Sequence, residues 1–181
     1  ERDVLLRDMH VTTETFGAAS CAIVEGCVDG PGDRRLLRFA TAAVNQGGAD
    51  LVAPDAASRP DLFAFSACHG HYHYEGFAEY QLRDGAGNVV RVGHKQAYCM
   101  EDSYQAIDGP ELMCTARYTC ESQGIQAGWA DLYGADLDCQ WIDITDVPPG
   151  SYELVVSVNP SRTFEEVTFD NNTTTVTVTI P

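Results

Sequence analysis

Hydrophobic and polar positions alternate along this chain over short stretches, without long stretches of the 3.6-residue period that is typical of helices. Short apolar runs are separated by clusters of Gly, Pro, Asp and Asn, which favour turns. The clearest case runs from Thr175 to Ile180, where Thr alternates with Val or Ile. Such alternation gives a strand one solvated and one buried face. The pattern therefore predicts an all-β fold.

Individual strands can be placed from the same pattern. Residues 35–44 predict one strand that ends at a turn-forming Asn-Gln-Gly-Gly sequence. Residues 76–82 and 89–92 flank a loop rich in hairpin-turn residues. Residues 152–158 follow a Pro-Pro-Gly turn and, together with the alternating segment at the end, predict the last part of a β-sandwich.

The middle of the chain, residues 97–133, has weak periodicity and many loop-forming residues. We expect a β-sandwich core that carries long functional loops there. The length of 181 residues is typical of one domain, so residues 1–181 are interpreted as a single domain.

The cysteines change this picture, because they indicate covalent cross-links. The seven cysteines lack paired CxxC spacing, which favours a disulfide framework outside the cytosol over a metal-binding role. Because the number of cysteines is odd, at least one of them has no disulfide partner within the chain. We therefore expect a secreted, extracellular protein whose signal segment is absent from the sequence or removed. No apolar run approaches the roughly 18 residues that span a bilayer, so no membrane partner is expected.

The formal charge of −16 argues against binding to nucleic acid, because the protein could not replace the counterions of a phosphate backbone. It favours cationic partners, although high charge also serves solubility alone. The basic residues are distributed unevenly: ten are arginines and one, Lys95, is a lysine. An amine becomes a nucleophile once its pKa is lowered, whereas a guanidinium does not. Lys95 is therefore a candidate for covalent chemistry.

Three of the five histidines, His69, His71 and His73, stand at alternate positions. On an extended segment their imidazoles would point to one face and close around a single metal ion. Neutral imidazole suits Zn, Cu, Fe and Ni, so the triad alone does not select the metal. His10 is interpreted as a surface or capping residue. His94 adjoins Lys95 and is a candidate for proton transfer.

These residues resemble the catalytic domain of lysyl oxidases. The similarity is carried by the histidine segment 68–73, by Gly-His-Lys at 93–95 and by the long run YGADLDCQWIDITDV at 133–147. It extends outward through 34–39 to 157–160 and 171–172, which covers nearly the whole chain.

The resemblance implies a cofactor and a reaction. It implies that His69, His71 and His73 bind Cu²⁺, and that Lys95 and Tyr133 become lysine tyrosylquinone. Such an enzyme deaminates primary amines, including peptidyl lysine, to aldehydes with O₂ and releases NH₃ and H₂O₂. A general base near Tyr133 is needed, and the candidates are the following: Asp131, Asp136, Asp138, Asp143 and His94.

The resemblance also implies disulfides between Cys21 and Cys68, between Cys27 and Cys139, and between Cys99 and Cys120. The third is open, because Trp129 stands where animal enzymes carry a cysteine. Cys114 then lacks an obvious mate and could bond Cys99 or Cys120 instead.

A second ion is implied between the first strand and a late loop, as a structural Ca²⁺ site of hard oxygen ligands. Thr168 replaces an aspartate there, which would weaken the binding, and a polar turn is the alternative. The matching positions are Asp3, the carbonyl of Val4, Glu166, Asn171 and Asn172.

Two other classes of function stay open. One is a non-catalytic extracellular β-sandwich that binds copper, which a mature quinone would exclude. The other is a zinc hydrolase that uses the histidine triad, for which the sequence offers no decisive partner motif.

Overall fold

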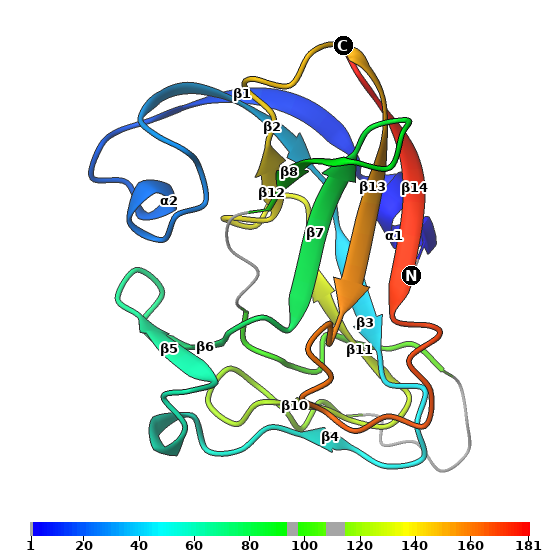
Figure 1. Ribbon diagram of the computed structural model, residues 1–181. Coiled ribbons are helices and arrows are strands. Elements are labelled where there is room, and N and C mark those ends of the chain that lie inside the picture. The colour runs from blue at the N-terminus through cyan, green and yellow to red at the C-terminus, as the bar shows by residue number, and fades with distance from the viewer. Residues whose placement is uncertain (1, 94–97, 108–114) are drawn as a thin grey trace.

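The computed structural model describes residues 2–93, 98–107 and 115–181 and consists mainly of strands (Figure 1). The helices are short: α1 (Arg2–Arg7), α2 (Cys21–Val24) and the 3₁₀ turn η1 (Ala56–Ser58). No helix among the described residues is long and apolar enough to cross a membrane. The expected all-β fold is confirmed. The strands are β1 (His10–Phe16), β2 (Gly32–Arg38), β3 (Thr41–Val44), β4 (Leu51–Val52), β5 (Phe63–Ser66), β6 (His71–Tyr74), β7 (Ala78–Arg83), β8 (Val89–Val92), β9 (Tyr104–Gln105), β10 (Gly124–Ile125), β11 (Trp129–Tyr133), β12 (Trp141–Asp143), β13 (Gly150–Val158) and β14 (Thr173–Ile180).

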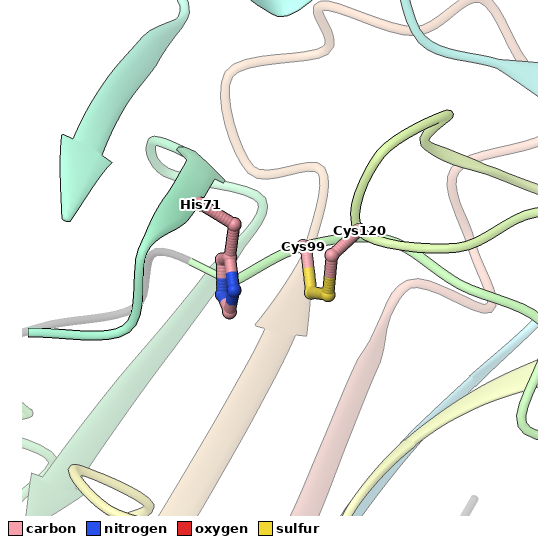
Figure 2. Close-up of side chains that lie close together, drawn as sticks. All are labelled: His71, Cys99 and Cys120. Carbon is pink, nitrogen blue, oxygen red and sulfur yellow. A yellow bond between two sulfur atoms is a disulfide. The ribbon is translucent and has the colours of Figure 1, made fainter.

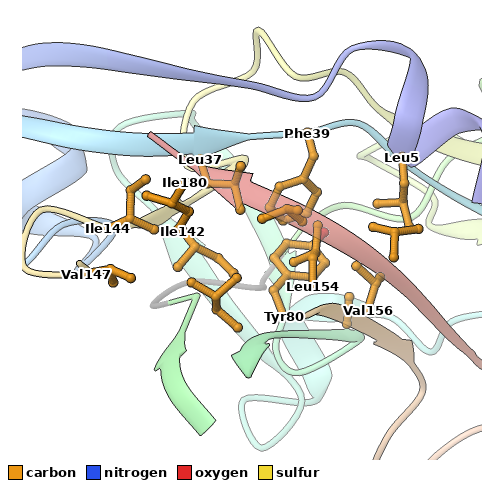
Figure 3. Packing of buried hydrophobic residues seen from close by; sticks show 14 of the residues in the cluster. Leu5, Leu37, Phe39, Tyr80, Ile142, Ile144, Val147, Leu154, Val156 and Ile180 are labelled. Carbon is orange, nitrogen blue, oxygen red and sulfur yellow. The ribbon is translucent and has the colours of Figure 1, made fainter. Parts of the chain in front are cut away.

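Two antiparallel sheets form the sandwich. A four-stranded sheet has the order β14-β13-β7-β8, and a three-stranded sheet has the order β1-β2-β12. Apolar side chains from both sheets form the main core between them (Figure 3). Leu37 comes from one sheet and Leu154 from the other, and each is at most 2% exposed. Burial of this apolar surface is the main stabilising contribution to this half of the molecule.

The strands of the core follow the alternation seen in the sequence. Along β14, Val176, Val178 and Ile180 are buried and the threonines between them are more exposed. Along β7, every second residue is buried in the same way. The predicted strands at 152–158 and 175–180 and the predicted hairpin over 76–92 are therefore confirmed, with small shifts of their ends.

The prediction of one strand over residues 35–44 is wrong. Strand β2 ends at Arg38 and β3 begins at Thr41, with Phe39 and Ala40 between them. The two strands belong to different sheets, because β2 pairs with β1 and β12 whereas β3 pairs with β11. Phe39 and Ala40 are both buried, so a continuous apolar run hides the point where the chain changes sheet.

The other half of the molecule, which we call the site half, comprises residues 41–77, 98–107 and 115–133. It consists of short strand pairings: β3-β11-β9, β10-β4 and the hairpin β5-β6. Trp129, which the resemblance places where animal enzymes carry a cysteine, is buried in an apolar cluster of this half. The cluster also contains Phe63, Tyr74 and Met100, so this position contributes apolar burial and not a cross-link.

Candidate functional site

The histidine triad lies on and just before the second strand of the β5-β6 hairpin. Ala64 pairs with His73 and Ser66 with His71, so the two histidines share one face of the strand. His69 lies in the preceding turn and not on an extended segment as expected. Gly70 has a φ of 75°, which suits glycine, and its N–H donates to the Ser66 carbonyl at 2.8 Å. The turn therefore brings His69 toward the other two rings from a different direction.

His71 and His73 are close enough to serve one metal ion, and the His69 ring lies beside them. The three ring centroids are 4.8 to 5.9 Å apart. The Nε2 atoms of His71 and His73 are 3.0 Å apart, so both nitrogens face a common point. Two ligands at right angles around a metal with bonds of about 2.0–2.1 Å would be separated by about 2.9 Å. His71 and His73 therefore fit a metal that prefers imidazole, such as copper.

Glu25, just after α2, joins this group from another part of the chain. Its Oε2 lies 3.2 Å from Nε2 of His69, and its Oε1 accepts a hydrogen bond from the Ser66 hydroxyl. The Glu25 side chain is only 8% exposed. A cavity of about 520 Å³ adjoins the group and is lined in part by Glu25, Phe65, His73 and Glu75. Solvent or a ligand can thus reach His73 beside two carboxylates.

A disulfide connects the histidines to the rest of the site half. Figure 2 shows the His71 imidazole facing the bond between Cys99 and Cys120. A ring nitrogen of His71 and the two Sγ atoms lie within 4.8 Å of one another. Because these sulfurs are bonded to each other, they are not the thiolates that bind metals. The disulfide positions Cys99 next to the triad instead.

Tyr133, the last residue of β11, reaches the same cysteine. Its hydroxyl donates to the Cys99 carbonyl at 2.5 Å and lies 3.0 Å from Oδ2 of Asp131. The Tyr98 ring packs on the Tyr133 ring with centroids 4.0 Å apart. The Tyr98 hydroxyl in turn donates to Oε1 of the buried Gln140 at 2.7 Å. The phenol of Tyr133 is therefore fixed by a carbonyl, a carboxylate and an aromatic ring.

The electrostatics of this phenol and carboxylate are unusual. Asp131 is fully buried, and burial raises the pKa of its carboxyl well above the usual range. Burial and the neighbouring Asp131 raise the pKa of the Tyr133 phenol well above its usual range. Groups with strongly shifted pKa values that meet in one place are candidates for catalysis.

The other carboxylates near Tyr133 in the sequence differ from Asp131. Asp136 and Asp138 are exposed. Asp143 is buried, but hydrogen bonds from Thr145 and Arg34 outweigh the effect of burial and lower the pKa of its carboxyl. The Arg34 guanidinium lies 2.7 Å from Asp143, which gives Asp143 a structural role. Asp131 is therefore the carboxylate that meets Tyr133.

Some of the expected site residues lie outside the described part of the chain: His94, Lys95 and Cys114. Tyr98, which packs on Tyr133, stands three positions after Lys95 in the sequence. The structure contains the disulfides that the resemblance implies, between the following pairs: Cys21 and Cys68, Cys27 and Cys139, Cys99 and Cys120. His10 lies on the surface, where its Nδ1 is 2.9 Å from the Asp8 carbonyl.

The positions expected to bind Ca²⁺ are brought together only in part. Glu166 Oε1 accepts from the Asn172 amide at 2.8 Å, whereas the Asn171 amide donates to Gln46. The resemblance implied a site beside the first strand, but Asp3 and Val4 lie in helix α1. Within the described ranges, no hydrogen bond or ion pair joins Asp3 to Glu166.

Two residues of the site were missed in the sequence, although a signal for each was present. Glu25 lies between Cys21 and Cys27, and the cross-link from Cys21 ends at Cys68, directly before His69. Tyr98 follows Lys95 closely in the segment that was expected to be functional. The expected Cys21–Cys68 pairing brings the Glu25 segment near His69 but does not place the Glu25 side chain, and side-chain packing is needed to identify Tyr98.

Comparisons with known proteins show which family this chain resembles. The family model described as "Lysyl oxidase" matches residues 3–180. Lysyl oxidase homolog 1 from Homo sapiens is 46% identical over 144 residues, which is 77% of this chain and 24% of the relative. Lysyl oxidase homolog 3B from Danio rerio is 42% identical over 164 residues, or 84% of this chain and 19% of the relative. Protein-lysine 6-oxidase from Gallus gallus is 42% identical over 145 residues, or 77% of this chain and 32% of the relative. The matched part thus spans about a fifth to a third of these relatives.

Proposed function

Because the chain belongs to the lysyl oxidase family, we propose that it is a copper-dependent amine oxidase. It would deaminate primary amines to aldehydes with O₂ and release NH₃ and H₂O₂. Its cofactor would be a lysine tyrosylquinone made from Lys95 and Tyr133. Residues 1–181 would form the single catalytic domain.

One observation carries the proposal: His71 of the triad and Tyr133 both lie against Cys99. His71 lies beside the Cys99–Cys120 disulfide, and the Tyr133 hydroxyl donates to the Cys99 carbonyl. The two candidate parts of the site come from β6 and β11, which are far apart in the sequence. A core with an incidental metal site would not require the contact between the Tyr133 phenol and the buried Asp131 carboxylate.

His69, His71 and His73 would hold the copper, and Lys95 and Tyr133 would provide the quinone. When bound, copper would activate the phenol toward O₂, and the quinone would accept the substrate amine and two electrons. The protein would contribute position and proton transfer. The Tyr98 ring and the Cys99 carbonyl hold the Tyr133 side chain in one orientation.

Asp131 would be the general base. Its Oδ2 lies 3.0 Å from the Tyr133 hydroxyl, within reach of a proton on a group bound there. Burial raises the pKa of Asp131, which makes the carboxylate a stronger base than an exposed aspartate. Asp136 is exposed and lies outside this contact, so we assign it no proton transfer. His94 stays a prediction as an alternative base.

The substrates would be cationic amines, such as lysine side chains of proteins or peptides. A net charge of −16 attracts such partners over a long range at low salt. Three disulfides favour an oxidising, extracellular location. A Ca²⁺ ion held by Glu166, Asn172 and the other expected oxygen ligands stays a prediction, as a structural site.

The test is a search for the cofactor in protein that was produced with copper and oxygen. We expect peptide mapping to find a cross-link between Lys95 and Tyr133, and phenylhydrazine to label the same peptide. Tyr133→Phe should abolish both signals, whereas Tyr98→Phe, a matched variant, should retain the cross-link.

Two outcomes would contradict the proposal. If copper is bound in full but no cross-link or label forms, the protein is a copper-binding module without catalysis. If metal analysis finds zinc and activity on a hydrolysable substrate continues without O₂, the triad belongs to a hydrolase.

A further inference from the structure

The environment of His69 differs from that of the other two histidines. The Nε2 atoms of His71 and His73 face each other at 3.0 Å, whereas Nε2 of His69 faces the Glu25 carboxylate at 3.2 Å. The two ring nitrogens of a histidine are chemically distinct, and the partner of one determines which role is left for the other. One ring nitrogen of His69 is therefore already paired with the Glu25 carboxylate.

Glu25 is held firmly in this position. It lies between Cys21 and Cys27, and both cysteines are cross-linked, to Cys68 and Cys139. The first cross-link joins the Glu25 segment to the residue directly before His69.

A hydrogen-bond network closes around the same carboxylate. The Ser66 hydroxyl donates to Glu25 and also accepts from the backbone N–H of His69 at 3.2 Å. The carboxylate, the hydroxyl and the imidazole thus form a closed group, and the Glu25 side chain is only 8% exposed.

We propose that Glu25 is a positioning residue of the metal centre: it accepts the Nε2–H of His69 and leaves Nδ1 of that ring as the metal ligand. This inference rests on the proposed function for the assignment of the triad as copper ligands. Histidines that bind metals commonly donate their second ring N–H to a carboxylate, which fixes the tautomer and the orientation of the ring. The triad is then asymmetric, because His71 and His73 offer Nε2 to the common point and His69 offers Nδ1.

The first experiment reads the tautomer directly. The protein is loaded with Zn²⁺ as a diamagnetic probe, and long-range ¹H–¹⁵N NMR spectra of the imidazoles are recorded. We expect His69 to carry its proton on Nε2 and the metal on Nδ1. A spectrum in which Nε2 of His69 binds the metal would overturn the proposal.

The second experiment measures Cu²⁺ affinity by competition with a chelator, independently of turnover. We expect Glu25→Ala to weaken binding by about 10- to 100-fold, the range found when such partners of metal-ligating histidines are removed. Glu25→Gln keeps an acceptor oxygen, so it should retain the tautomer and lose less affinity. Glu153→Gln, which changes the charge equally on an exposed site of β13, should bind copper like the wild type.

The remaining outcomes separate this inference from the proposed function. If Glu25→Ala binds copper as tightly as the wild type while phenylhydrazine still labels the protein, the role of Glu25 is refuted and the oxidase stands. If the affinity falls as expected but no label forms even in the wild type, the oxidase is refuted and the role of Glu25 stands. Disulfide mapping checks that the fold of the Glu25→Ala variant is intact. If it is not, the Cu²⁺ affinity of Glu25→Gln provides the test instead.

Discussion

The sandwich core and the site half of this protein are stabilised in different ways. In the core, strands such as β7 and β14 alternate apolar and polar residues, and together with β13 they bury a continuous cluster. In the site half the strands are short, and most of the buried polar and charged residues in the described ranges lie there: Thr41, Ser66, His73, Asp102, Gln123, Gln126 and Asp131. The Asp102 carboxylate, for example, accepts hydrogen bonds from the backbone N–H groups of Arg117, Tyr118 and Gln126. Apolar packing specifies a scaffold, whereas hydrogen bonds and cross-links fix individual functional groups at the positions that chemistry requires.

The comparison predicts, first, that a site residue can be changed with a large effect on rate and a small effect on stability. Asp131→Asn should lower turnover by about 10²- to 10⁴-fold, on the order of 3–5 kcal/mol in the barrier, because the proposed general base is lost. The quinone absorbance should persist, and steady-state kinetics with a primary amine would measure the effect. Asp136→Asn, on the exposed carboxylate nearby, should leave the rate unchanged. Full activity of Asp131→Asn would show that the base is another group, such as His94.

A core residue should behave in the opposite way. Leu154 is fully buried between the sheets, so Leu154→Ala should lower the free energy of unfolding by about 2–5 kcal/mol. Its turnover per folded molecule should equal that of the wild type. Urea denaturation measures the change, with Leu6→Ala at a 45% exposed position as the control. A change below about 0.5 kcal/mol, as is usual for surface substitutions, would contradict this account of the core.

The Cys99–Cys120 disulfide tests whether the two halves open separately. It closes a separation of 21 residues, so replacing both cysteines by serine should cost about 3 kcal/mol. We expect hydrogen exchange to accelerate in the site half, around β10 and β11, and to stay slow in β7 and β13. An equal acceleration in all four strands would mean that the protein unfolds as one cooperative unit.

The smallest effect concerns the pH dependence of stability. The pKa of Asp131 is raised in the folded protein, so the folded state holds this proton more tightly than the unfolded state. The associated stability is present below the unfolded value of about 3.9 and is lost as the pH rises through the raised pKa. Each tenfold difference in proton affinity between the folded and unfolded states corresponds to about 1.4 kcal/mol. Thermal unfolding of wild type and Asp131→Asn from pH 4 upward should show the wild type weakening relative to the variant. Parallel curves would mean that the pKa of Asp131 is not raised.

The sequence predicted the scaffold better than the site for a physical reason. Alternation along β14 reports directly on which side chains face the core, so the strands there were found. The buried pair Phe39 and Ala40 carries no such signal, because both residues are apolar and the change of sheet leaves no turn former. Two apolar residues that are both buried can therefore conceal, in the sequence, the break between two strands.

Within the site, spacing identified the histidines, and the resemblance identified Tyr133 and the pairing of the cysteines. Spacing did not indicate that His69 lies in a turn, because that depends on the positive φ of Gly70. Spacing also could not rank the aspartates, because their burial and their partners are not visible in the sequence. Asp131 is enclosed beside Tyr133, and Asp143 is paired with Arg34. Contacts between distant segments, such as that of Glu25 with His69, require the fold.

The outer strand of the four-stranded sheet has a consequence for how the protein behaves at high concentration. Strand β8 lies at the sheet edge, and Val89, Val90 and Val92 on it are 38 to 46% exposed. Such an edge can pair with the same edge of another copy. The charge of −16 makes copies repel one another at low ionic strength, but 1 M salt shortens the screening length to about 3 Å. Concentrated brine should thus promote oligomers through β8, which light scattering would detect and a Val90→Lys substitution would suppress.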